Sequence, residues 1–279
     1  MIVVTAANGQ LGRLVIEGLK AKVPADQIVA AVRSPEKAAD LGVAVRKADY
    51  NEPETLTAAL AGADKVLLIS GSEVGQRVEQ HRAAVEAAQK AGVRQLVYTS
   101  APKADTSPLI LAPEHKATEE IIRASGLPFT FLRNGWYNEN YLRTIEQAVS
   151  TGGFVGSAGQ GRIASAARAD YAAAAVEVLT SAGYENKVYE LSGDESWTYD
   201  DLAGEIGKAT GKTITYTDLT PDQHKAALIE AGVPDETAQF VVALDADTKA
   251  NLLGEITGEL RALIGRPTTP ITDTIAAAV

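Results

Sequence analysis

The stretch that most constrains the fold is Met1–Gly12, which reads MIVVTAANGQLG. Residues 2–4 form an apolar, largely β-branched run, which predicts a buried strand. Apolar residues then recur at helical spacing from Leu11 to Leu19, and a turn of small residues separates the two patterns. A strand, a tight turn and a helix in this order are typical of a dinucleotide-binding βαβ unit.

The turn follows the pattern Gly-x-x-Gly-x-x-Gly with one departure. Gly9 and Gly12 are in place, but Ala6 occupies the position of the first glycine. A helix N-terminus exposes unpaired N–H groups that attract a pyrophosphate, and side chains would keep the ligand away. If position 6 needs a positive φ, its methyl group costs roughly 1–2 kcal/mol; otherwise the methyl group only displaces the pyrophosphate. A strand-to-helix turn that is merely rich in glycine is the alternative interpretation.

Composition excludes several classes of function. The net charge of −10 argues against a nucleic-acid partner. No apolar run reaches the ~18–20 residues that cross a bilayer, and no leader pattern precedes the first strand. The absence of cysteine excludes disulfides and thiolate ligands, and the histidines at 81, 115 and 224 are too far apart to predict a metal site. We therefore expect a soluble, cytoplasmic protein with no metal, nucleic-acid or membrane partner.

Apolar runs alternate with helical patterns over the first ~135 residues. Strands are expected at residues 2–4, 27–33, 43–47, 65–70, 95–100 and 129–133. This alternation predicts an α/β fold: a Rossmann-type, doubly wound parallel sheet with helices on both faces. Ligands of such sheets bind at the carboxyl ends of the strands.

The end of the second predicted strand bears on the choice of cofactor. NAD-preferring sites usually place an acidic residue there, whereas an arginine accommodates the 2′-phosphate of NADP. This strand ends in Val32 and Arg33, and no acidic residue follows until Glu36. Arg33 therefore predicts NADPH as the cofactor, and a solvated loop arginine is the alternative. A helix is expected after it, with Ser34 as N-cap and Pro35 in its first position.

The pattern changes after residue 134. A segment dense in aromatic and amide side chains, WYNENY, precedes an expected helix through Val149, an apolar helix at 168–179 and a strand at 188–191. Ser196 or Thr198 can cap a further helix, and two or three helices close the chain. We expect residues 1–135 to form the NADP-binding domain and residues 136–279 a smaller α/β lobe, interleaved with the sheet, that forms the substrate pocket.

Several separated motifs occur in the order of a known family. They are TAANGQLG (5–12), Arg33, ISGSEVGQR (69–77), LRNGWYNENY (132–141) and ASAARADYAAAA (164–175), followed by VYELSGDESWT and LIGRPTTP. Together they resemble the NmrA-like atypical short-chain dehydrogenase/reductases, nearly from end to end. Within this family the chain is most similar to the bacterial NADPH:quinone oxidoreductases, and triphenylmethane dye reductases share much of the pattern.

The resemblance implies which residues contact the cofactor. The phosphate turn falls on residues 6–11 and the 2′-phosphate arginine on Arg33, while the loop 72–74 would pass near the nicotinamide. The stretch 136–141 would wrap the nicotinamide and form a wall of the substrate pocket. The implied residues are Ala6, Ala7, Asn8, Gly9, Gln10, Leu11, Arg33, Ser72, Glu73, Val74, Trp136, Tyr137, Asn138, Glu139, Asn140 and Tyr141.

The usual acid–base pair of short-chain dehydrogenases is missing. The place of Tyr-x-x-x-Lys holds His115-x-x-x-Glu119, which makes alcohol–ketone exchange an improbable reaction. A quinone needs mainly a hydride and contact between the two rings, so proximity can supply much of the catalysis. Tyr137 is the candidate pocket phenol, and His115 is a candidate proton donor near pH 7. The alternatives are a packing tyrosine and a structural histidine.

Three functions are compatible with these residues. The first is an NADPH-dependent reductase that transfers a hydride to quinones or similar flat, electron-poor acceptors, without a required flavin. The second is an NADP(H)-binding, redox-sensing regulator of the NmrA type that has no turnover. The third is a reductase of triphenylmethane dyes. A homodimer is a possible assembly for each of them.

Overall fold

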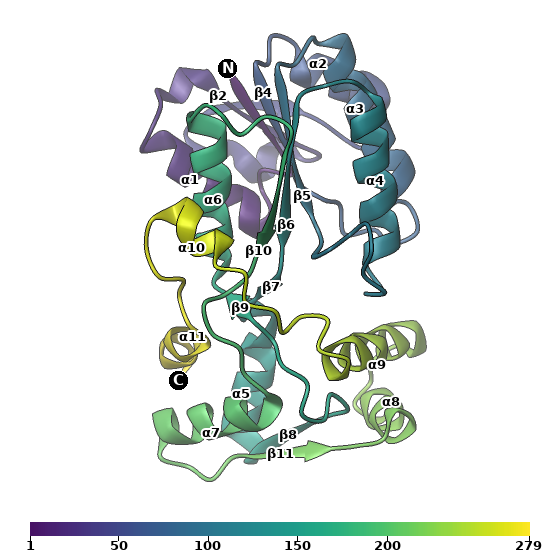
Figure 1. Cartoon of the computed structure of the whole chain (residues 1–279), viewed down its shortest axis with the longest axis vertical. Coiled ribbons are helices and arrows are strands. Elements are labelled where there is room, and N and C mark those ends of the chain that lie inside the picture. The colour runs from purple at the N-terminus through teal and green to yellow at the C-terminus, as the bar shows by residue number, and fades with distance from the viewer.

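The computed structural model describes residues 1–279, and a seven-stranded parallel sheet forms one half of the molecule (Figure 1). The sheet confirms the predicted doubly wound fold. Its order β10-β6-β5-β4-β1-β2-β3 reverses direction between β1 and β4, which is where open α/β sheets bind ligands. The strands are β1 (Ile2–Thr5), β2 (Ile28–Val32), β3 (Ala44–Lys47), β4 (Lys65–Leu68), β5 (Gln95–Ser100), β6 (Phe129–Asn134) and β10 (Lys187–Leu191).

Helices cover both faces of the sheet (Figure 1). One face carries α1 (Gln10–Lys20), α6 (Arg168–Thr180) and α10 (Glu259–Ile264), and the other carries α2 (Pro53–Leu60), α3 (Arg77–Lys90) and α4 (Ala112–Ala124). Strands β1, β2 and β5 are buried along their whole length, because each is covered on both faces. This double burial explains their nearly continuous apolar sequences.

The other half is a smaller lobe (Figure 1). Its core is a cluster of 16 buried residues, mainly aromatic and aliphatic, to which the segment from the end of β5 to the start of α4 contributes Ala101, Leu109 and Ala112. Thr198 and Thr220 cap α7 and α8 with capping boxes. Of the two caps that the sequence allowed, Ser196 and Thr198, the structure therefore has Thr198. The elements are α5 (Leu142–Thr151), β8 (Gly153–Gly156), α7 (Tyr199–Thr210), β11 (Thr215–Asp218), α8 (Pro221–Glu230), α9 (Asp235–Lys249) and α11 (Ile271–Ala278).

The chain crosses between the two halves several times. A short parallel pair, β7 (Trp136–Tyr137) and β9 (Ser165–Ala166), lies at the crossing. The chain then returns as α6, which packs on α1, and as β10, which pairs with β6 at the edge of the sheet. Residues beyond 135 therefore contribute to both halves.

The structure corrects two expectations about helices. Ser34 is the N-cap residue and Pro35 the first residue of the helix at 35–41, as expected, but this helix is a 3₁₀ helix, η2 (Pro35–Leu41), and the Ser34 side chain makes no capping hydrogen bond. Four helices, α8 to α11, close the chain where two or three were expected, because α10 and α11 have only 6 and 8 residues and carry little periodic signal. Two further 3₁₀ turns are η1 (Ala25–Gln27) and η3 (Asn138–Tyr141). No helix combines the length and apolarity needed to cross a membrane.

Candidate functional site

The turn between β1 and α1 has the geometry of a phosphate cradle. Gly9 is the N-cap of α1, and its N–H donates to the carbonyl oxygen of Ala6 at 2.9 Å. A Cβ atom on Gly12 would lie 2.5 Å from that oxygen and 2.6 Å from Cα of Ala7, so no larger residue fits without a shift of the backbone. The absence of a side chain at Gly12 thus lets α1 pack directly against the backbone of Ala6 and Ala7. The first N–H groups of α1 lack partners within the helix and remain available to an anion.

Ala6 adopts φ 48°, in the left-handed region. This settles the question left open by the sequence: position 6 does require a positive φ. We expect Ala6→Gly to bind NADPH at least as tightly as the natural protein, because glycine adopts this φ without the strain of roughly 1–2 kcal/mol and adds no bulk to the lining of the cavity. Fluorescence titration with NADPH measures this. Markedly weaker binding would show that the phosphate lies elsewhere.

A cavity of about 410 Å³, here called the cofactor cavity, opens at the switch point of the sheet. The phosphate turn forms one wall, the ends of β2 and β3 form another, and the loop after β4 closes the side. The residues that line it are Ala6, Asn8, Gly9, Gln10, Leu11, Gly12, Arg33, Ser34, Lys37, Ala48, Asp49, Tyr50, Asn51, Ile69, Ser70, Gly71, Ser72, Glu73 and Gln80. Ala7 is fully buried behind the turn and does not line the cavity.

A second cavity of about 360 Å³, here called the acceptor cavity, adjoins the first. The two share Leu11 and residues 69–72, so they form one continuous cleft across the carboxyl ends of the strands. The remaining lining comes from the ends of β5 and β6 and the segments that follow them, the first turns of α3 and α4, the start of α6 and the loop after α9. These residues are Arg77, Thr99, Ser100, Ala101, Pro102, Leu109, Leu111, His115, Asn134, Gly135, Trp136, Tyr137, Asn140, Arg168 and Leu253.

Arg33 lies at the far end of the cofactor cavity, together with Ser34 and Lys37. Its side chain is 66% exposed, and Nη1 lies 3.2 Å from a carboxylate oxygen of Glu73. Two cations and a hydroxyl at this end suit a phosphate monoester. Lys37 was not predicted as a site residue, because it lies four residues beyond the strand, in a helix whose orientation the sequence does not fix.

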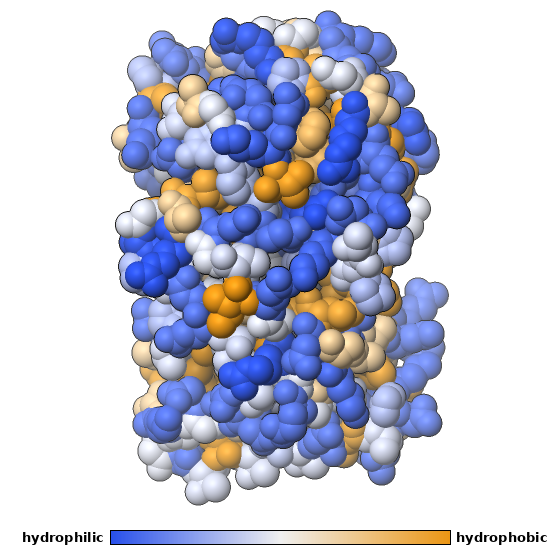
Figure 2. All heavy atoms as spheres, viewed as in Figure 1, coloured by the Kyte–Doolittle hydropathy of each residue, from blue (hydrophilic) through white to orange (hydrophobic).

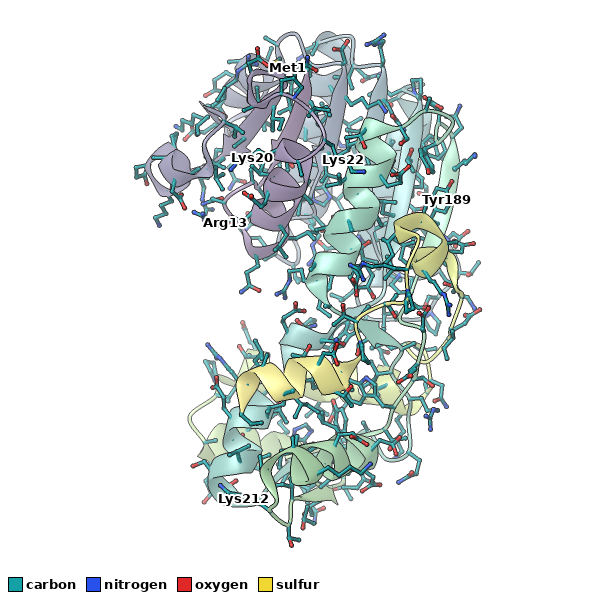
Figure 3. The ribbon with its side chains drawn as sticks, turned by 90° about the vertical axis from the view of Figure 1, so that its left-hand side faces the viewer. Met1, Arg13, Lys20, Lys22, Tyr189 and Lys212 are labelled. Atoms are coloured by element: carbon teal, nitrogen blue, oxygen red, sulfur yellow. The ribbon has the colours of Figure 1, made fainter.

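Arg13 holds this end of the cavity in place. Its Nε donates to the carbonyl oxygen of Asn8 at 3.2 Å, and its Nη2 donates to that of Lys37 at 2.6 Å. Both terminal nitrogens also bond the carboxylate of Asp40, and hydrogen bonding by Arg13 lowers the pKa of Asp40. Arg13 lies on α1 near the end that faces the smaller lobe (Figure 3). It thus ties the phosphate turn to η2, and sequence reasoning did not identify it.

The loop after β4 lies differently from the expectation. Ser72 lines both cavities, but Glu73 turns toward β2, where it contacts Arg33 and accepts a hydrogen bond from Gln80 at 2.8 Å. Val74 is 58% exposed and lines neither cavity. The loop was expected to pass near the nicotinamide. Of its three residues only Ser72 lines the acceptor cavity, because the ion pair holds Glu73 at the Arg33 end of the cofactor cavity.

The segment 136–141 divides into lining and supporting residues. Trp136, Tyr137 and Asn140 line the acceptor cavity. Asn138 is fully buried and bonds Ser165 and the carbonyl oxygen of Thr269, and Tyr141 packs edge-on against Trp197. Both carboxylate oxygens of Glu139 accept from the backbone N–H of Arg168 at 3.0 Å. The side chains of Asn138, Glu139 and Tyr141 thus support the wall from behind.

His115 lies in the lining of the acceptor cavity, with its Nδ1 2.8 Å from the hydroxyl of Tyr98. Burial, reinforced by the nearby charge of Arg77, lowers the pKa of His115 to about 3. The imidazole is therefore neutral at pH 7 and has no imidazolium proton to give. This corrects the expected chemistry of His115, which is left with a hydrogen-bonding role.

Glu119 occupies the helix position where the typical family pair would place its lysine. It is fully buried, accepts from Ser100 Oγ at 2.7 Å and pairs with Arg133 at 2.7 Å. Burial opposes the charge of Arg133, but Glu119 and Glu190 hold its pKa above the usual range. These contacts make Glu119 part of a structural ion pair, so this helix supplies no acid–base pair to the cavity.

Asn134 and Arg168 are among the acceptor-cavity residues that were not predicted as site residues. Asn134 ends β6 and Arg168 begins α6. Both lie within the quoted family motifs, 132–141 and 164–175, but neither was assigned a role there. The rule that ligands bind at the carboxyl ends of strands could have found Asn134. For Arg168 the motif gave no position in space, because only the return of the chain to the sheet brings it beside Tyr137.

Known proteins share this architecture. Residues 6–182 match the NAD(P)H-binding family. Quinone oxidoreductase 2 of Escherichia coli (strain K12) is 50% identical over 279 residues, which cover 99% of this chain and 98% of that protein. Its crystal structure, described as NADPH-dependent quinone oxidoreductase complexed with NADPH, matches with a TM-score of 0.96 over 99% of both chains.

A second solved structure shows the same likeness at lower identity. Triphenylmethane reductase of Citrobacter sp., complexed with NADP(H), matches with a TM-score of 0.96 at 39% identity over 100% of both chains. The resemblance drawn from the sequence motifs is confirmed by these matches. The chain belongs to the NAD(P)H-binding family, in the group that includes quinone oxidoreductase 2 and triphenylmethane reductase.

Proposed function

We propose that this protein is an NADPH-dependent reductase that transfers a hydride to quinones or similar flat, electron-poor small molecules. The observation that carries the proposal is the continuous cleft, with a phosphate cradle and two cations at one end and an aromatic wall at the other. The 50% identity to quinone oxidoreductase 2 supports the same reaction.

The residues of the cleft fit NADPH. Gly9 and Gly12 let the chain turn closely from β1 into the N-terminus of α1, and Arg33 with Lys37 offers positive charge for a 2′-phosphate. In the acceptor cavity, Oδ1 of Asn134 is buried and has no hydrogen-bond partner. A buried acceptor without a partner is costly, and the carboxamide N–H of a nicotinamide is a donor of the kind it lacks.

The overall reaction would convert a quinone, NADPH and one proton into a hydroquinone and NADP⁺. NADPH supplies the hydride, that is, two electrons and one proton, and solvent supplies the second proton. The protein's part is to place the acceptor ring against the nicotinamide and to receive the negative charge that develops on the quinone oxygen. Trp136 and Tyr137 offer ring faces for stacking, and Leu109, Leu111 and Leu253 reduce access of water.

Cofactor choice tests the role of Arg33. Arg33→Ala should weaken NADPH binding about 30- to 100-fold and leave NADH binding within about threefold, because only NADPH carries the phosphate that a charged hydrogen bond of ~2–3 kcal/mol would hold. Dissociation constants for both cofactors by fluorescence titration measure the ratio. Arg46→Ala is a matched control, since Arg46 lies on β3 outside the cleft and bonds the carbonyl oxygens of Ala59 and Ala61. Equal losses for NADPH and NADH would exclude a 2′-phosphate role.

Turnover separates an enzyme from a regulator. We expect the protein to oxidise NADPH with at least one acceptor from a panel of benzoquinones and naphthoquinones, followed as the loss of absorbance of the reduced nicotinamide. Cofactor binding without oxidation above background for any quinone would favour the regulatory function. Turnover with triphenylmethane dyes alone would favour the dye reductase.

A further inference from the structure

Arg168 carries an uncompensated positive charge into the acceptor cavity. Its guanidinium lies over the ring of Tyr137, with Cζ 4.7 Å from the ring centroid, and has no carboxylate within ion-pair distance. The other arginine of this cavity, Arg77, is paired with Glu114 at 3.3 Å and donates to the carbonyl oxygen of Gly71. No aspartate or glutamate lines the acceptor cavity. The free charge that faces a bound acceptor is therefore that of Arg168.

The position of Arg168 in its helix is electrostatically unfavourable. It is the first residue of α6, where the positive end of the helix dipole favours acidic side chains. Glu139 offsets this by accepting the Arg168 backbone N–H with both carboxylate oxygens, but it makes no contact with the guanidinium. An arginine placed against the dipole and left without a counter-ion gains little stability for the fold, so a ligand is the natural partner of its charge.

Tyr137 beside it is arranged to donate a hydrogen bond. Nδ2 of Asn134 donates to the hydroxyl oxygen of Tyr137 at 3.2 Å, and no hydrogen-bond acceptor within the protein takes the proton of Tyr137. Tyr171 fixes the ring by an edge-on contact at 5.1 Å between centroids. The phenol proton and the guanidinium thus belong to one face of the cavity.

We propose that Arg168 and the Tyr137 hydroxyl form the anion-receiving end of the acceptor cavity, which selects neutral acceptors that gain negative charge on reduction over acceptors that are already cations. This inference rests on the proposed hydride transfer to a small-molecule acceptor. A neutral quinone that receives a hydride becomes a hydroquinone anion, whose oxygen the two groups stabilise as the charge develops. A triphenylmethane carbocation instead enters with positive charge, which the guanidinium repels, and leaves neutral.

Kinetics with two acceptors of opposite character test the proposal. Arg168→Gln should lower kcat for neutral 2-methyl-1,4-naphthoquinone about 10- to 100-fold with little change in KM, because the neutral ground state contacts the charge weakly. The same variant should leave the turnover of a cationic triphenylmethane dye unchanged or raise it. Tyr137→Phe should lower quinone turnover less, about 3- to 10-fold, and Arg168→Lys should restore part of the loss. Arg143→Gln, which removes an exposed charge from α5 outside both cavities, is the matched control and should change neither reaction.

Binding provides a readout that needs no turnover. The protein saturated with NADP⁺ is titrated with 2-hydroxy-1,4-naphthoquinone, which is an anion at neutral pH, and with its neutral 2-methoxy analogue. Tryptophan fluorescence reports both ligands, since Trp136 lines the cavity. Arg168→Gln should weaken binding of the anion at least tenfold and that of the neutral analogue less than twofold. The NADPH dissociation constant should stay the same.

Three results would overturn the proposal: equal losses for anion and neutral analogue, unchanged binding of both, or weakened NADPH binding in Arg168→Gln, which would assign the charge to the cofactor. Failure of the proposed function looks different. In that case the natural protein would oxidise no NADPH with any quinone, while the binding comparison would still report on Arg168.

Discussion

Gly12→Ala is expected to lower the free energy of unfolding by about 2–3 kcal/mol and to abolish measurable NADPH binding. The added Cβ would meet the carbonyl oxygen of Ala6 at 2.5 Å and backbone atoms of Ala7 at 2.6 Å and 2.9 Å, and backbone cannot rotate away as a side chain can. Helix α1 must therefore move off β1, which also displaces the N–H groups that face the phosphate. Urea denaturation and fluorescence titration with NADPH measure the two effects.

Gly204→Ala is the matched control. Gly204 lies inside α7, and a Cβ there would have no heavy atom within 4 Å. The same chemical change should then raise the free energy of unfolding by about 0.5–1 kcal/mol, since alanine is the better helix former, and leave NADPH binding unchanged. Similar responses of the two variants would refute the close-contact explanation for Gly12.

Mild acid is expected to destabilise the protein through two buried histidines. Burial, with a contribution from Arg77, lowers the pKa of both His81 and His115 to about 3, whereas an unfolded chain has a histidine pKa of ≈ 6.5. Below pH 6.5 the unfolded state therefore binds protons that the folded state does not. The two neutral histidines therefore contribute to the free energy of unfolding. This contribution is complete above pH 6.5 and is lost as the pH falls toward 3. From pH 7 to pH 5 the loss is about 2 kcal/mol for each histidine.

The slope of stability against pH identifies the groups responsible. Urea denaturation at pH 7, 6 and 5 gives the slope for the natural protein and for the double variant His81→Gln/His115→Gln. The variant should have a much flatter profile between pH 7 and 5, whatever its absolute stability, because a glutamine does not titrate. A natural protein with a flat profile, or a variant with an unchanged slope, would contradict the assignment.

Local patterns in the sequence predicted the sheet, because each central strand is buried on both faces and therefore reads as an apolar run. The N-terminal turn and the position of Arg33 could also be predicted, because both lie within a few residues of a recognisable strand end. Gly12 is the clearest case. Its place in the glycine pattern singled it out, and a Cβ there would lie 2.5 Å from the carbonyl oxygen of Ala6.

The rest of the site depends on contacts between distant residues. Arg168 is 31 positions from Tyr137 along the chain, yet its guanidinium lies over that ring. Glu73 lies at the Arg33 end of the cofactor cavity because of an ion pair with Arg33, 40 residues away. The low pKa of His115 likewise follows from burial, which no spacing reveals. Contacts of this kind determine the protonation state of a side chain and the direction in which it points. The local sequence pattern contains information on neither.

The surface drawn in Figure 2 has no large apolar patch that would indicate a protein partner. The face in Figure 2 is mostly hydrophilic, and apolar residues form small separate groups on it. The exposed large apolar residues are likewise scattered along the chain, from Leu14 to Val279. The cleft therefore remains the part of the molecule with the strongest indication of a ligand.

Because the chain crosses repeatedly between its two halves, neither half can be separated from the other by a single cut in the sequence. Ten of the 26 buried residues in the core on the α1 face come from beyond residue 135, and seven of these belong to α6. A fragment that ended at 135 would lose the helix that covers α1 and the strand that pairs with β6. Residues 1–135 alone therefore do not make up a dinucleotide-binding domain that could be transferred to another protein. Gene fusions or swaps that exchange acceptor specificity must keep α6 and β10 with the sheet and replace only the segments that lie outside it.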